Sequence, residues 1–135
     1  TRALCDKAME RDVILSFEFH EGTFNDNGIS SLEFLKAVSR ENLSTYWQPL
    51  RVKNDFENLK TVAPYVNGVH VFQWDCFGMK YALDEGTQEW NKYIAYLRDN
   101  SLNTDYILEF VKDDSPEQFK NDARILKEIL ASLYN

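Results

Sequence analysis

Apolar residues along this chain follow two spacings, one typical of buried strands and one typical of amphipathic helices. Four short runs rich in β-branched and aromatic residues predict strands, at Val13–His20, Leu43–Gln48, Val69–Trp74 and Asp105–Val111. Helical spacing predicts a first helix at Ala3–Glu10 and four more, which begin near Ser30, Asn54, Thr87 and Ser115. The pattern therefore predicts one helix followed by four strand–helix units.

Polar residues at two of the predicted helix starts support this division. Ser30 and Glu33 form a candidate capping box. Ser115-Pro116-Glu117-Gln118 combines a favoured N-cap residue with a proline in the first turn. Asn67-Gly68 predicts a turn before the third strand, and a longer connection, Asp75–Gly86, follows that strand.

The alternation of strands and helices favours a parallel sheet with crossover helices. Two architectures fit it: a small doubly wound sheet of the flavodoxin kind, and half of a (β/α)8 barrel, which needs roughly 250 residues when complete. No linker or low-complexity segment divides the sequence, so residues 1–135 are expected to form a single domain. No glycine-rich GxGxxG turn or P-loop is present, and the polar residues at the strand ends distinguish the two architectures.

Charged and amide side chains recur on each of the four predicted strands. Glu18 and His20 point to one face of the first strand, because successive side chains alternate between faces. Gln48 ends the second strand, His70 lies on the third, and Glu109 lies on the fourth. Barrel enzymes build their active sites at the C-terminal ends of the strands, so this pattern favours the barrel.

Two carboxylates, one imidazole and one amide form a suitable ligand set for a divalent ion such as Mn²⁺, Mg²⁺, Co²⁺ or Zn²⁺. Taken singly, each of these residues more commonly has a structural role. Glu18 would be a paired carboxylate and Glu109 an exposed edge residue. His70 would be a hydrogen-bonded histidine, and Gln48 would bond to the backbone. One such residue on each of four successive strands favours a shared metal site over four separate structural roles.

The same segments resemble a known group of proteins. Phe17-Glu18-Phe19-His20-Glu21-Gly22-Thr23-Phe24 resembles the fifth strand and following loop of the xylose isomerase-like superfamily of sugar phosphate isomerases and epimerases. Tyr46-Trp47-Gln48-Pro49 resembles the sixth strand of that superfamily, and Val69-His70-Val71-Phe72 resembles the seventh. Leu108-Glu109-Phe110-Val111 resembles the eighth strand, and Ser115-Pro116-Glu117 resembles the start of its closing helix. The resemblance implies that the chain is the C-terminal half, strands 5–8, of a (β/α)8 TIM barrel in a longer protein.

The resemblance also implies a metal-dependent isomerase or epimerase that acts on a sugar or sugar phosphate. The positions of the metal ligands are those of Glu18, Gln48, His70 and Glu109. The two carboxylates, Glu18 and Glu109, would also exchange protons with a ketose or hydroxy-ketone. Gln48 stands where the family usually has an aspartate, and a neutral amide binds a cation more weakly than a carboxylate does.

Further candidates for substrate contact lie near the predicted strand ends: His20, Glu21, Trp47 and Trp74. A hydrogen-bonded loop start is the alternative for the first two, and ordinary packing, which is commoner, is the alternative for the tryptophans. Arg51 and Lys80 are candidates for a phosphate contact, with solvated surface charge as the commoner role.

Composition narrows the class of partner. The chain carries a net charge of −7 without a cluster of basic side chains, which argues against nucleic-acid binding. That charge and the presence of only two histidines also argue against the DNA-repair endonucleases, which the superfamily resembles. Cys5 and Cys76 lack disulfide or metal spacing, and neither a membrane span nor a secretion leader is visible, so a cytoplasmic protein is expected.

Two functional hypotheses are open at this point: a catalytic isomerase or epimerase, and a non-catalytic fragment or degenerate half-barrel. A half-barrel has two open sheet edges and an uncovered inner face, and both favour association. The chain is therefore expected to pair with a second copy or with the absent N-terminal half.

Overall fold

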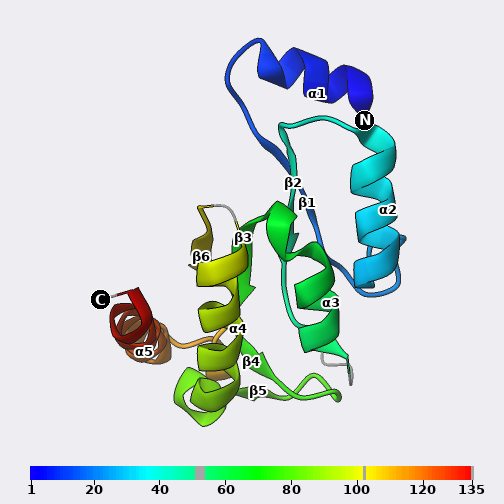
Figure 1. Ribbon diagram of the computed structural model, residues 1–135. Helices are drawn as coiled ribbons and strands as arrows, with labels where there is room; N and C mark the ends of the chain where they lie inside the picture. The colour runs from blue at the N-terminus through cyan, green and yellow to red at the C-terminus, as the bar shows by residue number, and fades with distance from the viewer. Residues whose placement is uncertain (51–53, 102, 135) are drawn as a thin grey trace.

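The computed structural model describes residues 1–50, 54–101 and 103–134, and it confirms the predicted alternation of strands and helices (Figure 1). Four strands form one parallel sheet in the order β1-β2-β3-β6: β1 (Leu15–Glu18), β2 (Leu43–Trp47), β3 (Val66–Val71) and β6 (Asp105–Leu108). The chain is therefore an α/β fold in which the strands run in one direction and their C-terminal ends lie at the same edge of the sheet.

Helices precede, connect and follow these strands. The α-helices are α1 (Arg2–Met9), α2 (Gly28–Val38), α3 (Asp55–Val62), α4 (Thr87–Asn100) and α5 (Pro116–Tyr134). Short 3₁₀ turns occupy Ala63–Tyr65, Leu83–Gly86 and Lys112–Asp114. None of the described helices is long and apolar enough to cross a bilayer. The thiols of Cys5, which is buried, and Cys76, which is exposed, are both free.

The two faces of the sheet differ in what covers them. On the outer face, side chains of Trp47, Val69 and Val71 are fully buried in a core with residues of α3, α4 and α5, such as Leu59 and Ile94. The alternate positions, on the inner face, carry mostly polar residues and remain partly open. A parallel sheet normally has both faces covered, so the open inner face is the unusual feature of this fold.

A second, smaller core lies where α1 meets the end of α2. Cys5 of α1 is buried with Leu35, Val38 and Leu43. Arg2 strengthens this contact, because its guanidinium donates hydrogen bonds to the backbone carbonyls of Ala37 and Val38. The first helix is thus fixed at the end of the sheet opposite the C-terminal ends of the strands.

The predicted turn at Asn67-Gly68 is wrong, because both residues lie inside β3. Gly68 faces Tyr46 across the β2–β3 pair, next to a register shift between Thr45 and Tyr46. The ring of Tyr46 occupies the space where a side chain at position 68 would stand. Glycine at this position therefore serves close packing in a strand and not a turn.

The third predicted strand, Val69–Trp74, is two separate strands in the structure. β3 ends at Val71, and β4 (Gln73–Trp74) pairs antiparallel with β5 (Lys80–Tyr81). The side chain of Asp75 accepts hydrogen bonds from the backbone amides of Phe77 and Met79 and so fixes the tight connection between β4 and β5. The long connection after the third strand is therefore an ordered hairpin over part of its length.

The helix starts agree with the sequence signals at one place and differ at another. Ser115 caps α5 as predicted, since its Oγ accepts a hydrogen bond of 3.1 Å from the backbone amide of Gln118. The predicted capping box at Ser30 and Glu33 is wrong. Asn27 caps α2, with its Oδ1 accepting a 3.0 Å hydrogen bond from the Ser30 amide, because α2 begins two residues earlier than the apolar spacing indicated.

Asp122 is a buried carboxylate that joins α5 to the segment before α4. Its Oδ1 accepts hydrogen bonds of 3.0 Å from the Leu83 amide and 2.7 Å from Gln118 Nε2. We predict that Asp122→Ala lowers the free energy of unfolding by about 1–3 kcal/mol, because a buried backbone amide loses its acceptor. Urea unfolding measures this loss, with Asp84→Ala, which removes an exposed carboxylate nearby, as the matched control. Equal loss in both variants would contradict the prediction.

Candidate metal centre

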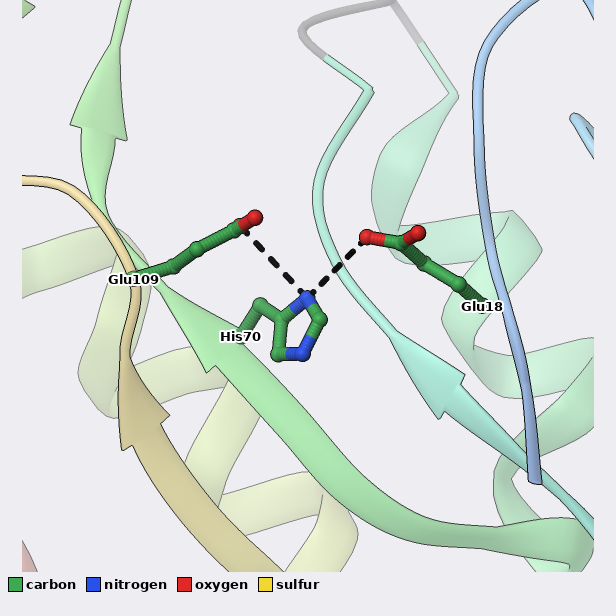
Figure 2. Close-up of side chains that lie close together, drawn as sticks. All are labelled: Glu18, His70 and Glu109. Carbon is green, nitrogen blue, oxygen red and sulfur yellow. Dashed lines mark ion pairs between the residues drawn. The ribbon is translucent and has the colours of Figure 1, made fainter. Parts of the chain in front are cut away.

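Three side chains converge at the C-terminal edge of the sheet (Figure 2): Glu18 of β1, His70 of β3 and Glu109, which directly follows β6. Nδ1 of His70 lies 3.4 Å from Oε1 of Glu18 and 3.4 Å from Oε2 of Glu109. One ligand atom from each residue can be chosen such that all three lie within 4.8 Å of one another. Both carboxylates thus contact the same nitrogen of the imidazole, and in Figure 2 they lie to its left and right.

The strand register explains why residues so distant in the sequence meet here. Glu18 is opposite Tyr46, Tyr46 is opposite Gly68, and His70 is opposite Ile107. Side chains two residues apart on a strand share a face. A two-residue step from Tyr46 leads to Gln48, and one from Ile107 leads to Glu109. All four predicted ligand residues therefore project from the inner face of the sheet.

Gln48 completes this arrangement. It follows β2 directly and is 8% exposed. Its Oε1 lies 3.0 Å from Nδ1 of His70, so the amide and both carboxylates all face the same ring nitrogen. The structure thus brings together every residue that the sequence suggested as a metal ligand: Glu18, Gln48, His70 and Glu109.

The electrostatics of this cluster are unfavourable for two ionised carboxylates. Partial burial raises the pKa of Glu109 above its ordinary value; the nearby His70 works in the opposite direction, and the negative charge of Glu18 raises the pKa further. The side chain of Glu109 is 27% exposed, against 44% for Glu18 and 20% for His70. A cation between the two carboxylates would relieve their mutual repulsion.

The donor set fits a divalent ion. Metal–oxygen and metal–nitrogen distances are about 2.0–2.6 Å, so two ligands of one ion lie at most roughly 4–5 Å apart. The 4.8 Å spread of the ligand atoms falls within this range. Carboxylate oxygens, an amide oxygen and an imidazole suit Mg²⁺, Mn²⁺, Co²⁺ or Zn²⁺, and they do not choose among these ions.

A small pocket opens beside the cluster. Its volume is about 170 Å³, and its wall includes Glu18, Gln48 and Glu109 together with three of the predicted substrate-contact residues, His20, Glu21 and Trp74. His20 and Glu21 are exposed, and Nδ1 of His20 lies 2.9 Å from the Glu21 carbonyl. His20 and Glu21 therefore combine the two roles considered from the sequence: they form a hydrogen-bonded loop start, and they also line the pocket.

Trp47 does not reach the pocket, contrary to its place among the predicted substrate contacts. Its side chain is fully buried on the outer face and packs edge-on against Tyr93, with 5.0 Å between ring centroids. The reason is the alternation along β2: because Gln48 faces inward, its neighbour Trp47 faces the helices.

Aromatic residues that the sequence reasoning missed line the pocket with Trp74. Phe72 and Phe110 lie 5.0 Å and 4.6 Å from the Trp74 ring, measured between centroids. Lys80 lies over the rings of Trp74 and Phe110 and pairs with Asp114 at 2.5 Å. Phe110 directly follows Glu109, and Phe72 lies two residues after His70. This closeness to candidate ligands could have identified both phenylalanines as pocket residues. Arg51 lies outside the described residues.

The loop after β1 holds Glu18 through Asn25, which the sequence also did not indicate as a site residue. Asn25 is 5% exposed, and its Nδ2 donates a hydrogen bond to the backbone carbonyl of Glu18. Thr23 joins the same network by donating a 2.7 Å hydrogen bond to the His20 carbonyl. The polar composition of Glu21–Gly28 indicated a turn but not this attachment.

Comparison with known proteins shows which solved structures have a similar fold. No family model matches the sequence, and no curated protein matches it significantly. A solved structure described as a xylose isomerase-like TIM barrel protein from Mycobacterium smegmatis in complex with magnesium is similar, with a TM-score of 0.78 and 20% identity over 98% of this chain and 49% of that one. A second, the probable 3-DHS dehydratase AsbF involved in petrobactin synthesis from Bacillus anthracis, has a TM-score of 0.75 and 18% identity over 93% of this chain and 53% of that one.

These similarities confirm the resemblance seen in the sequence at the level of the fold. The chain is built like part of a xylose isomerase-like TIM barrel, and it spans about half the length of the two barrels it matches. The flavodoxin-like alternative has no support among these neighbours.

We predict that Glu18→Gln lowers the pKa of Glu109. The negative charge of Glu18 is one of the causes that raise this pKa, whereas the larger contribution of burial stays in place, so the shift is partial. Carboxyl carbon resonances of Glu109, followed by NMR in the presence of a chelator, measure the change. Glu33→Gln, which removes an exposed carboxylate on α2, is the control and should leave the Glu109 titration unchanged.

Proposed function

We propose that this chain carries the metal-binding wall of a sugar or sugar phosphate isomerase or epimerase. The observation that supports it is the convergence of Glu18, His70 and Glu109 at the ends of three separate strands, with ligand atoms within 4.8 Å of one another. In TIM barrels, active sites lie at the C-terminal ends of the strands, which is where this cluster lies. The magnesium named for one structural neighbour adds weight to a divalent ion here.

The proposed reaction is proton transfer next to the carbonyl of a ketose or hydroxy-ketone. A bound divalent ion supplies Lewis acidity, which stabilises negative charge on the substrate oxygens. Glu18 and Glu109 reach Nδ1 of His70 from two different parts of the sheet, which suits one of them to remove a proton and the other to return it.

The pocket residues have roles that follow from their positions. His20 and Glu21, exposed at the rim, would contact substrate hydroxyl groups, and Trp74 with the adjacent Phe110 would exclude water from one side. A net charge of −7 and the absence of a basic cluster in the sequence favour a small-molecule substrate over nucleic acid. The proposal also includes a cytoplasmic location, which is consistent with the two free thiols.

Dehydration is the second candidate reaction. One structural neighbour is described as a probable 3-DHS dehydratase, and dehydration of a hydroxy-ketone can begin with the same proton removal next to a carbonyl. Glu18 and Glu109 would then have different roles: one would remove the proton, and the other would protonate the departing hydroxyl group. Product analysis separates the two reactions, since only dehydration gives an unsaturated carbonyl compound that absorbs in the ultraviolet.

The proposal includes a completed barrel. The chain would be the C-terminal half, strands 5–8, and a second set of parallel strands would pair with the open edges of β1 and β6 and cover the inner face. Those strands would come from the N-terminal half of a longer protein or from a second copy of this chain. Without them, the chain is a half-barrel that binds a metal ion but lacks one wall of the substrate pocket.

We predict that divalent ions bind through the four inner-face residues. Calorimetry with Mn²⁺ should show that Glu18→Gln and His70→Ala each weaken binding at least about tenfold, or about 1.4 kcal/mol. Gln48→Asp should strengthen it, because a carboxylate replaces a neutral amide near His70 Nδ1. Glu33→Gln, on an exposed position of α2, should have no effect. Unchanged affinity in the first two variants would remove the metal site from the proposal.

We predict that the 135-residue chain alone self-associates through its open edges. The β6 edge borders a hollow of about 610 Å³ lined by Tyr106, Leu130 and Tyr134, and Ile107 on its inner face is 42% exposed. Ile107→Lys should shift sedimentation velocity profiles toward the monomer, because a charged edge disfavours strand pairing. Phe119→Lys, on an exposed position of α5, is the control. A monomeric wild-type chain that binds no hydrophobic dye would count against association.

A further inference from the structure

The imidazole of His70 lacks the support that a metal-binding histidine usually has. Such a histidine commonly donates its second ring N–H to a carboxylate or carbonyl, which fixes the orientation of the ring. Among the described residues, Nδ1 of His70 faces Glu18, Gln48 and Glu109, and Nε2 makes no hydrogen bond. Figure 2 shows the ring turned with Nδ1 toward the two carboxylates. In this structure the contacts of Nδ1 orient the ring, the shortest of them at 3.0 Å to Oε1 of Gln48. A bound ion would occupy the side of the ring where these contacts lie, so a neighbour on another side is needed to hold the ring for the ion.

Tyr46 is the aromatic residue next to this ring. It lies on the inner face of β2, opposite both Glu18 of β1 and Gly68 of β3. The centroids of the Tyr46 and His70 rings are 5.4 Å apart, with an angle of 37° between the ring planes. Tyr46 thus lies level with Glu18 and one inner-face position before Gln48 and His70 along the strands.

Gly68 leaves the space that the ring of Tyr46 occupies next to His70. A Cβ built on Gly68 would lie within 3.0 Å of three carbon atoms of the ring, with Cζ at 2.6 Å. Real Cβ atoms do not approach other atoms so closely, so any side chain at position 68 would displace the ring. The backbone of Gly68 lies in an ordinary strand and has no positive φ, so the glycine is required by the contact and not by its conformation.

We propose that Tyr46 and Gly68 together position His70 for metal binding. The ring of Tyr46, seated over Gly68, limits the imidazole to the orientation in which Nδ1 faces Glu18, Gln48 and Glu109. This takes the place of the usual hydrogen bond to the second ring nitrogen. Tyr46 is a positioning residue that acts through His70, and the inference rests on the proposed role of His70 as a ligand.

The first test requires no metal. NMR three-bond couplings to Cγ of His70, measured in the metal-free chain, report whether its χ1 angle is fixed or averaged. We expect one rotamer in the wild type and in Tyr46→Phe, which keeps the ring, and averaged couplings in Tyr46→Leu. Tyr65→Leu is the matched control, since Tyr65 packs in the separate core around Cys5. A fixed rotamer in Tyr46→Leu would overturn the proposal.

The second test measures metal affinity and coordination with Co²⁺ alone as the probe. We expect Tyr46→Leu to weaken Co²⁺ binding about tenfold to a hundredfold and to change the visible absorption of the bound ion, whereas Tyr46→Phe stays within about twofold of the wild type. Failure of the wild type to bind Co²⁺ would count against the metal site, and the χ1 measurement would still decide whether Tyr46 positions His70.

A double-mutant cycle separates the pair from a general loss of stability. Gly68→Ala should lower the thermal unfolding midpoint because the new methyl group meets the Tyr46 ring. In the Tyr46→Ala background, the same substitution should have a much smaller effect, since the ring is gone. Equal effects of Gly68→Ala in both backgrounds would show that Gly68 is needed for another reason and would overturn the pairing.

Discussion

The parallel register of β1, β2, β3 and β6 is the constraint on which the rest of this molecule depends. It places Glu18, Tyr46 and Gly68 at one level across three strands and His70 opposite Ile107. Since side chains alternate strictly, a slip of one residue in any pair would turn an inner-face ligand into the outer core. The same register buries Trp47, Val69 and Val71 under the helices, so packing on one face fixes the chemistry on the other.

The two faces therefore have different energetic roles. Burial of the apolar outer face against α3, α4 and α5 provides most of the favourable free energy of folding, because it removes large apolar side chains from water. The inner face contributes little burial and holds carboxylates close together, an arrangement that costs free energy when no cation is present. A site of this kind is maintained by a stable scaffold elsewhere in the chain.

Small features of the backbone adjust this arrangement. The register shift between Thr45 and Tyr46 and the missing side chain of Gly68 leave room for an aromatic ring next to His70. Asn25 attaches the loop after β1 to the Glu18 carbonyl, which holds the first ligand from the other side. Glu18 is thus held through a hydrogen bond to its backbone, whereas the ring of His70 has both a polar contact with Gln48 and an aromatic neighbour, Tyr46.

The sequence by itself determined the order of the four sheet strands and the five α-helices, and the residues of the candidate cluster. Both follow from local periodicity: hydrophobic spacing separates strands from helices, and alternation along a strand separates inward from outward residues. Ser115 was also identifiable as a cap, since capping depends on neighbours within one turn.

Only the tertiary structure decided the features that depend on a partner far along the chain. Asn67-Gly68 has the composition of a turn, yet it lies in β3 because Tyr46 packs over it from another strand. Trp47 was grouped with the pocket, although the inward orientation of Gln48 turns it to the core. The distances that join Glu18, His70 and Glu109 were likewise undetermined, because the register between parallel strands is set by the packing of the whole sheet and not by any one segment.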